Sequence, residues 1–304
     1  MNPSYLNLSK KELAKRIDAL FEIMESCEVC PRNCHVNRTK DEKGFCKLGK
    51  LPIVSSFHPH FGEEKPLVGS EGSGTIFFTS CNLSCVYCQN YEISQLRKGE
   101  EISFEKLADI MIDLEDKGCH NINLVSPTPQ VPQIVEALSI AIEKGLKLPL
   151  VYNTNSYDSV KVLKLLDGIV DIYMPDVKYS DNKAALKYSK VSGYFEIMKK
   201  AIKEMYCQAG DLKLNKQGIA TRGLLVRHLV LPNNTAGSDE IFEFLSKEIS
   251  KNTFLNIMNQ YRPCYEAFEY PELSRGITSE EYEEALKLAK QKGLKRLYRD
   301  KDFQ

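Results

Sequence analysis

The sequence lacks an excess of charge of either sign. Lysine and arginine together number 41, aspartate and glutamate also number 41, and the formal net charge is zero. A surface that binds nucleic acid or an anionic membrane needs clustered positive charge. We therefore expect neither nucleic acid nor a membrane surface as a partner, and a zinc module that reads nucleic acid is disfavoured for the same reason.

Long apolar runs, repeats and low-complexity tracts are also missing. No run approaches the roughly 20 apolar residues that a membrane-spanning helix needs, and the first residues lead into a charged helix instead of an apolar signal region. The composition, 42% hydrophobic and 27% charged, is close to the globular average. These features predict an ordered cytoplasmic protein.

After Gly74, apolar runs of strand length alternate with helical patterns, which predicts a parallel sheet with right-handed crossovers. The expected strands are 75–79, 122–125, 148–152, 169–174, 224–231 and 254–258. Helices are expected from Ser9, near 104–116, 131–144, 159–166, 184–205 and 238–250, and after Thr278. Polar residues at most strand ends favour an α/β fold with a partial (β/α)6 TIM-like barrel over a doubly wound sheet. We expect residues 1–72 to form an N-terminal cysteine-rich extension of helix and loops, and residues 73–304 to form the core with C-terminal helices.

Seven of the ten cysteines fall into two tight groups. In a cytosolic chain of this size such spacings indicate metal binding or catalysis more often than disulfides. The remaining three, Cys119, Cys207 and Cys264, are expected to be ordinary buried thiols, although Cys264 is placed to reach the barrel mouth.

The second group, Cys81, Cys85 and Cys88, follows the first expected strand, so its three thiols should share one loop at the active-site face of the barrel. Thiolates select zinc, Cu(I) or iron–sulfur clusters. A four-iron cubane held by three cysteines keeps one iron open to an outside ligand. A zinc site with a distant fourth ligand and a chance cluster are the alternatives.

The Cys-x3-Cys-x2-Cys spacing after the first strand resembles that of the radical S-adenosylmethionine (SAM) superfamily. Four further segments resemble the branch related to pyruvate formate-lyase activating enzyme: His60-Phe-Gly-Glu-Glu64, Gly72-Ser-Gly-Thr-Ile-Phe-Phe78, Cys88-Gln-Asn-Tyr-Glu-Ile-Ser94 and Asn256-Ile-Met-Asn-Gln-Tyr-Arg-Pro263. The resemblance implies a [4Fe-4S] cluster and S-adenosyl-L-methionine as cofactors. In that family the reduced cluster cleaves SAM to methionine and a 5′-deoxyadenosyl radical, which abstracts hydrogen from a substrate.

The same resemblance suggests which residues surround SAM. Tyr87 occupies the aromatic position that lies against adenine in this superfamily. The Gly-Gly-Glu segment of many members is replaced here by Val125-Ser-Pro-Thr-Pro129, so backbone carbonyls and the hydroxyls of Ser126 and Thr128 must supply any contacts. The full set assigned to the cofactor is Tyr87, Asn90, Ser126, Thr128, Asn153, Asp176, Lys178 and Arg227. A plain salt bridge across the barrel mouth is the alternative for Asp176 and Lys178, and His228 is expected to face away from Arg227.

The first cysteine group, Cys27, Cys30, Cys34 and Cys46, supplies four thiolates, enough to saturate a structural zinc or an auxiliary cluster. Zinc would fold this loop-rich segment, whereas a second cluster could feed electrons to the first. The spacing does not decide between them, with a slight preference for the cluster. In known glycyl-radical activating enzymes, extra cysteines follow the SAM-binding group instead of preceding it.

Three functions follow from these motifs. The first is radical SAM activation of a glycyl-radical protein, and the second is radical SAM modification of a peptide or small molecule. Both need an external electron donor such as flavodoxin or ferredoxin. The third is a non-enzymatic iron–sulfur or zinc scaffold, which predicts no cleavage of SAM.

Overall fold

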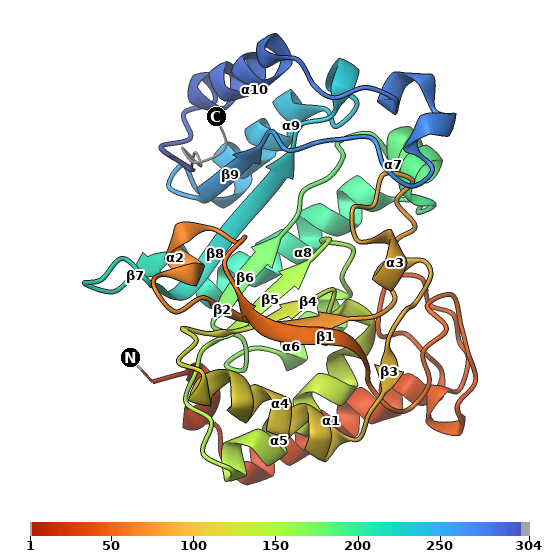
Figure 1. Ribbon diagram of the computed structural model, residues 1–304, viewed down its shortest axis with the longest axis vertical. Coiled ribbons are helices and arrows are strands. Elements are labelled where there is room, and N and C mark those ends of the chain that lie inside the picture. The colour runs from red at the N-terminus through yellow and green to blue at the C-terminus, as the bar shows by residue number, and fades with distance from the viewer. Residues whose placement is uncertain (1, 299–304) are drawn as a thin grey trace.

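A parallel sheet forms the centre of the computed structural model, which describes residues 2–298 (Figure 1). The sheet has ten strands in the order β10-β9-β8-β6-β5-β4-β2-β1-β3, with β7 paired to β8. Its parallel strands include β2 (Ser73–Phe78), β4 (Ile122–Val125), β5 (Leu150–Thr154), β6 (Ile172–Pro175), β8 (Ala220–Leu229) and β9 (Phe254–Met258). The six expected strands and the α/β partial-barrel fold are confirmed.

Four further strands widen the sheet beyond the sequence-based expectation. They are β1 (Ile53–His60), antiparallel to β2; β3 (Glu100–Glu101), antiparallel to β1; β7 (Lys213–Leu214), antiparallel to β8; and β10 (Arg296–Tyr298), parallel to β9. The cysteine-rich extension thus contributes a strand to the sheet. Because the order ends at β3 and β10, the barrel stays open between these two edges.

Helices cover the outer face of the sheet. They are α1 (Lys10–Glu25), α4 (Phe104–Asp116), α5 (Val131–Glu143), α6 (Val160–Leu165), α7 (Asn182–Ser189), α8 (Tyr194–Ala209), α9 (Ser238–Phe244) and α10 (Ser279–Gln291), with the short α2 (Lys65–Val68) and α3 (Tyr91–Ser94). Figure 1 shows α1, α4 and α5 together along one side. The expected N-caps Ser9 and Thr278 accept from the third backbone amide of their helices. In the described part of the chain, no helix has the length and apolar character to cross a bilayer.

The single helix expected near 184–205 is two helices. Lys190 (φ 56°) and Gly193 (φ 62°) adopt left-handed conformations between α7 and α8, and the chain turns there. This break leaves Ser189, the last residue of α7, facing the cysteine loop, where its hydroxyl contacts Cys85.

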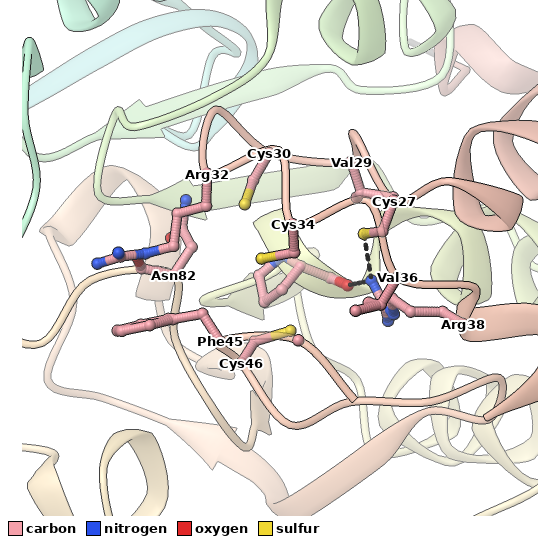
Figure 2. Close-up of a pocket in the computed structure, with 12 residues that line it drawn as sticks. Cys27, Val29, Cys30, Arg32, Cys34, Val36, Arg38, Phe45, Cys46 and Asn82 are labelled. Carbon is pink, nitrogen blue, oxygen red and sulfur yellow. Dashed lines mark hydrogen bonds between the residues drawn. The ribbon is translucent and has the colours of Figure 1, made fainter. Parts of the chain in front are cut away.

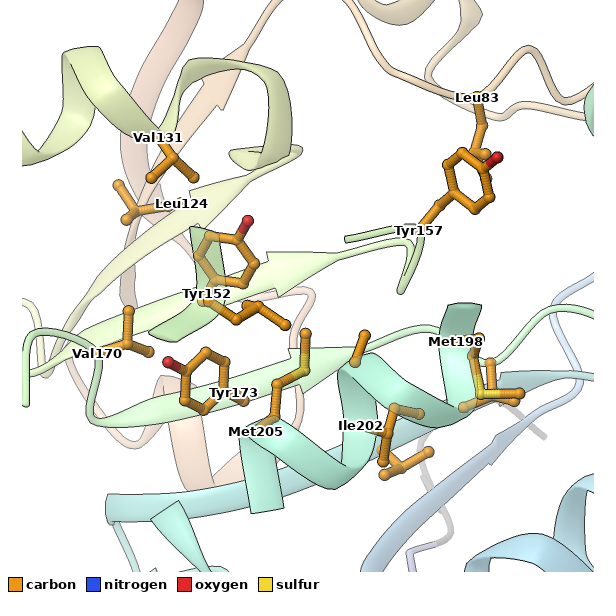
Figure 3. Packing of buried hydrophobic residues seen from close by; sticks show 14 of the residues in the cluster. Leu83, Leu124, Val131, Tyr152, Tyr157, Val170, Tyr173, Met198, Ile202 and Met205 are labelled. Atoms are coloured by element: carbon orange, nitrogen blue, oxygen red, sulfur yellow. The ribbon is translucent and has the colours of Figure 1, made fainter. Parts of the chain in front are cut away.

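The main hydrophobic core lies between the sheet and α8. Figure 3 shows Tyr152 and Tyr173 beside Met205, and the two tyrosine rings meet edge to face with centroids 5.9 Å apart. Because α8 turns Met205 and its apolar neighbours towards the sheet, Cys207 faces solvent. The expectation that Cys207 is buried was therefore wrong, whereas Cys119 is buried as expected.

A buried carboxylate ties β5 to the loops at its C-terminal end. Asp158 accepts hydrogen bonds from the hydroxyls of Thr154 at 2.6 Å, Thr128 at 2.8 Å and Tyr152 at 2.9 Å. Burial raises the pKa of Asp158, although the three hydroxyl donors act in the opposite direction. The carboxylate holds the residues after β4 against those after β5, beneath the cysteine loop.

We expect Asp158→Ala to lower the free energy of unfolding by about 3 kcal/mol, because three buried hydroxyls lose their acceptor. Urea unfolding followed by circular dichroism measures this change. Asp116→Ala, at an exposed position of α4, is the matched control and should stay close to wild type. Equal stability of the two variants would contradict a structural role for Asp158.

Candidate functional site

The loop after β2 carries Cys81, Cys85 and Cys88, called the triplet below. Ser80 begins the loop in a left-handed conformation (φ 68°). Two backbone hydrogen bonds attach the loop to α7 and the turn after it: the Val86 amide donates to the Tyr188 carbonyl at 2.8 Å and the Ser84 amide to that of Ser189 at 3.0 Å. The triplet therefore lies at the C-terminal end of the parallel strands, as predicted.

Each sulfur of the triplet has a side-chain hydrogen-bond partner from a different part of the fold. The Asn155 amide donates to Cys81 Sγ at 3.2 Å, and the Ser189 hydroxyl donates to Cys85 Sγ at 3.0 Å. The Ser94 hydroxyl lies 3.1 Å from Cys88 Sγ. Donors of this kind stabilise negative charge on sulfur.

The triplet lies partly buried beside a cation: Cys85 is buried, and Cys81 and Cys88 are half-buried. Burial raises the pKa of Cys81 to about 11 and that of Cys85 to about 12, while the Lys178 ammonium lowers both. Without a metal these thiols would stay protonated near neutral pH, and a bound metal displaces such protons. Three thiols on one loop, with matching donors and a nearby cation, fit a [4Fe-4S] cluster held by three cysteines.

A network of part-buried charges connects the strand ends next to the triplet. Asp176, after β6, binds the Lys178 ammonium at 2.9 Å and Arg227 Nε of β8 at 2.8 Å. Arg227 also donates to Glu63 at 3.0 Å and to Asn153 at 2.7 Å. Burial alone would raise the pKa of Asp176, but the charges of Arg227 and Lys178 outweigh it and lower the pKa to about 2.

Arg227 and Lys178, two of the predicted SAM contacts, differ in how many of their side-chain donors already have partners. The side-chain donors of Arg227 already bind Asp176, Glu63 and Asn153, so Arg227 acts mainly to position Asp176. Lys178 has three ammonium hydrogens, one of which goes to Asp176, and its charge lowers the pKa of Cys81 and of Cys85. The alternative of a salt bridge between Asp176 and Lys178 is therefore observed, and contact between Lys178 and SAM stays a prediction.

The other predicted SAM contacts have different surroundings. Tyr87 is buried, with Tyr261 and Tyr179 edge to face at 5.8 and 6.4 Å. Asn90 is exposed at the start of α3, and Ser126 has a left-handed backbone (φ 58°) after β4. The Thr128 hydroxyl is occupied by Asp158 and Thr154. Contact between SAM and these residues stays a prediction.

Two expectations about single residues are supported. His228 is buried away from the mouth, where its ring nitrogens lie 2.8 Å from the Val177 carbonyl and 2.9 Å from the Ser238 hydroxyl. Cys264 reaches the triplet loop, because its thiol donates to the Tyr87 carbonyl at 3.3 Å.

The four N-terminal cysteines line one pocket, together with Arg32, Arg38 and Asn82 (Figure 2). Asn82 directly follows Cys81 in the chain, so the pocket adjoins the triplet loop. Within residues 2–298, no three or more histidine, cysteine, aspartate or glutamate side chains are arranged around the position of a single metal ion.

Sequence reasoning missed the hydrogen-bond partners of the triplet and the basic residues of the pocket. Ser189 is 104 positions from Cys85, and no spacing rule connects residues so far apart. Arg32 and Arg38 carried a signal, because each lies inside the first cysteine motif, where buried positive charge can balance metal-bound thiolates.

Residues 75–210 match the family model of the Radical SAM superfamily. An uncharacterised protein of Methanocaldococcus jannaschii, MJ0674, is 37% identical over 308 residues, which cover 98% of this chain and 82% of the relative. A second uncharacterised protein of that organism, MJ0808, is 27% identical over 298 residues, covering 90% of this chain and 80% of the relative.

Among solved structures, methylornithine synthase (PylB) has a TM-score of 0.47 at 13% identity, covering 95% of this chain and 72% of that chain. The structure of anSMEcpe with bound AdoMet has a TM-score of 0.49 at 14% identity, covering 70% of this chain and 57% of that chain.

The lowered pKa of Asp176 predicts an acid-dependent loss of stability. A carboxylate whose pKa is about 2 in the folded protein and about 3.9 when unfolded stabilises the fold above pH 4, and this contribution disappears as the pH falls towards 2. The difference in free energy of unfolding between wild type and Asp176→Asn should therefore shrink between pH 5 and pH 2. Urea titrations at each pH measure it, and a constant difference would contradict the assignment.

Proposed function

The chain belongs to the radical SAM superfamily, and we propose that it cleaves SAM reductively at a [4Fe-4S] cluster held by Cys81, Cys85 and Cys88. The family implies both cofactors. When they are bound, this chemistry supplies a 5′-deoxyadenosyl radical that removes a hydrogen atom from a substrate. The observation that carries the proposal is the triplet itself, with each sulfur hydrogen-bonded by a different side chain.

In this proposal the protein's own side chains hold the cysteine sulfurs, position Lys178 and limit the access of solvent. Asn155, Ser189 and Ser94 hold the three sulfurs in place and stabilise their charge. Lys178, hydrogen-bonded to Asp176, is the cation proposed to meet the carboxylate of SAM, since its charge lowers the pKa of Cys85 in the triplet. Burial of Cys85 and partial burial of Cys81 and Cys88 limit access of water and of oxidants to the sulfurs.

For the substrate we propose a protein segment, as in activation of a glycyl-radical protein. The support is the open side of the barrel, near which β1, the neighbour of the edge strand β3, presents an exposed His58 and a half-buried His60, whose rings pack against Phe77 at 5.4 and 5.7 Å. An extended segment can enter such a lateral opening. A reduced flavodoxin or ferredoxin is the proposed electron donor. Modification of a free peptide or small molecule is the alternative, and the non-enzymatic scaffold does not agree with family membership.

The triplet should be essential for cleavage of SAM. The protein, reconstituted anaerobically with iron and sulfide and reduced with dithionite, should form 5′-deoxyadenosine from SAM. The Cys81→Ala/Cys85→Ala/Cys88→Ala variant should form none, because no ligands remain for the cluster. Cys207→Ala, at an exposed cysteine, is the matched control and should retain wild-type activity. A fully loaded wild type without deoxyadenosine would overturn the proposed function.

The hydrogen bonds to sulfur should set the reduction potential of the triplet's cluster. A hydrogen bond worth about 1 kcal/mol corresponds to roughly 40 mV for a one-electron couple. Because such bonds favour the more negative reduced state, Ser189→Ala should lower the potential by a few tens of millivolts. Redox titration followed by electron paramagnetic resonance measures the shift. Ser192→Ala, at an exposed serine nearby, should leave the potential unchanged, and an equal shift in both variants would refute the assignment.

A further inference from the structure

The N-terminal cysteine pocket, defined by Cys27, Cys30, Cys34 and Cys46, is assembled from two short loops. A backbone pairing brings the first three cysteines together: the Cys27 amide donates to the Val36 carbonyl at 2.9 Å, and the His35 amide donates to the Cys27 carbonyl at 3.2 Å. Gly44 lets the second loop approach, because a Cβ atom there would lie 2.9 Å from Cys34 Cβ and 3.0 Å from its sulfur.

A small pocket lies between the four cysteines. Figure 2 shows the four sulfur atoms around this space, with Phe45 and Arg32 on one side and Arg38 on the other. Backbone amides two positions after the cysteines, those of Arg32 and Leu48, donate to the Cys30 and Cys46 sulfurs. Cys81 in the triplet has the same local contact, from the Leu83 amide at 3.4 Å.

Arg38 is a buried cation. It is 1% exposed, and no carboxylate of residues 2–298 pairs with it. Two guanidinium nitrogens donate to the carbonyls of Pro129 at 2.8 Å and Gly49 at 3.2 Å, and one reaches the Cys27 sulfur at 3.9 Å. Among the described residues, Nε has no hydrogen-bond partner. An uncompensated buried charge costs several kcal/mol, and thiolates bound to a metal supply the missing negative charge.

The placement of the sulfurs favours a cluster over zinc. Zinc binds sulfur at about 2.3 Å, so four sulfurs around one ion must lie within roughly 3.8 Å of one another. The thiolates of a cubane each bind a different iron and stand further apart. Within residues 2–298, no three of these side chains are arranged around a single metal position.

The pocket and the triplet share residues. Asn82, which lines the pocket, accepts from the Asn155 amide that also holds Cys81: the Asn155 nitrogen lies 2.8 Å from Asn82 Oδ1 and 3.2 Å from Cys81 Sγ. Arg32 donates to the Asn82 carbonyl at 2.5 Å, stacks 3.4 Å from the Phe45 ring centroid and interacts electrostatically with Cys30, Cys34 and Cys81. One cation therefore lies between the two cysteine groups.

We propose that the N-terminal cysteine pocket holds a second iron–sulfur cluster, with Arg38 as its buried counter-ion, and that electrons enter the protein there and pass to the triplet. The inference rests on the proposed function, which gives the triplet its need for electrons. One electron leaves a reduced flavodoxin- or ferredoxin-type donor, reduces the second cluster and moves on to the triplet's cluster. No covalent bond forms or breaks in this transfer.

The first experiment asks which metal the pocket binds. The Cys81→Ala/Cys85→Ala/Cys88→Ala variant, reconstituted anaerobically, should keep about four irons and four sulfides per chain and show an electron paramagnetic resonance signal on reduction. Wild type should hold about twice as much iron. One zinc per chain and no iron in this variant would overturn the proposal, as would the absence of any metal.

The second experiment separates electron entry from a structural role. Cys27→Ser/Cys30→Ser/Cys34→Ser/Cys46→Ser should form 5′-deoxyadenosine with dithionite, which reaches the triplet directly, but only a small fraction of the wild-type amount with reduced flavodoxin. Cys207→Ser is the control. Equal loss with both reductants, or no loss with either, would overturn electron entry. If wild type forms no deoxyadenosine with dithionite, it is the proposed function that fails.

The third experiment tests Arg38 and does not depend on the quadruple variant folding. In the background that lacks the triplet cysteines, Arg38→Met should shift the potential of the remaining cluster downwards, because a nearby positive charge favours the reduced state. Arg38→Lys should restore most of the shift. If the cluster has the same reduction potential in the background protein and in its Arg38→Met variant, the counter-ion role is refuted.

Discussion

The part-buried ion pair between Asp176 and Arg227 is the interaction on which the site depends. It joins the C-terminal ends of β6 and β8, which pair in parallel, and extends through Glu63 into the N-terminal extension. Charges removed from water are tolerated only when paired and hydrogen-bonded. Arg227 therefore binds three partners at once, and Asp176 also binds the ammonium of Lys178.

The triplet illustrates how a flexible loop becomes a rigid ligand set. Three cysteines within eight positions can adopt many arrangements, but here Asn155, Ser189 and Ser94 each bind one sulfur. These partners come from the end of β5, the end of α7 and the end of α3. Because they belong to separate elements, the geometry of the sulfurs is set by the packing of the whole barrel and not by the loop alone.

Three sets of contacts join the N-terminal extension to the barrel. β1 pairs with β2 in the sheet, Glu63 enters the charged network, and Arg32 and Asn82 connect the first cysteine pocket to the triplet loop. The basic side chains Arg32 and Arg38 accompany the four cysteines at each side of the pocket. The extension is thus a part of the site and not only an attachment to it.

The sequence by itself determined the six central strands, most helices, the two cysteine groups and the radical SAM family, because periodicity and short spacings are local properties of the chain. It also placed Asp176, Lys178 and Arg227 at strand ends. It did not predict the break between α7 and α8, the outward position of Cys207 or the strand β1. Only the tertiary structure decided which donors reach the sulfurs, that Thr128 is occupied by Asp158, and that Asn82 and Arg32 lie between the two cysteine groups. These contacts join residues far apart in the chain, and their existence depends on how the strands and helices pack, which no local pattern encodes.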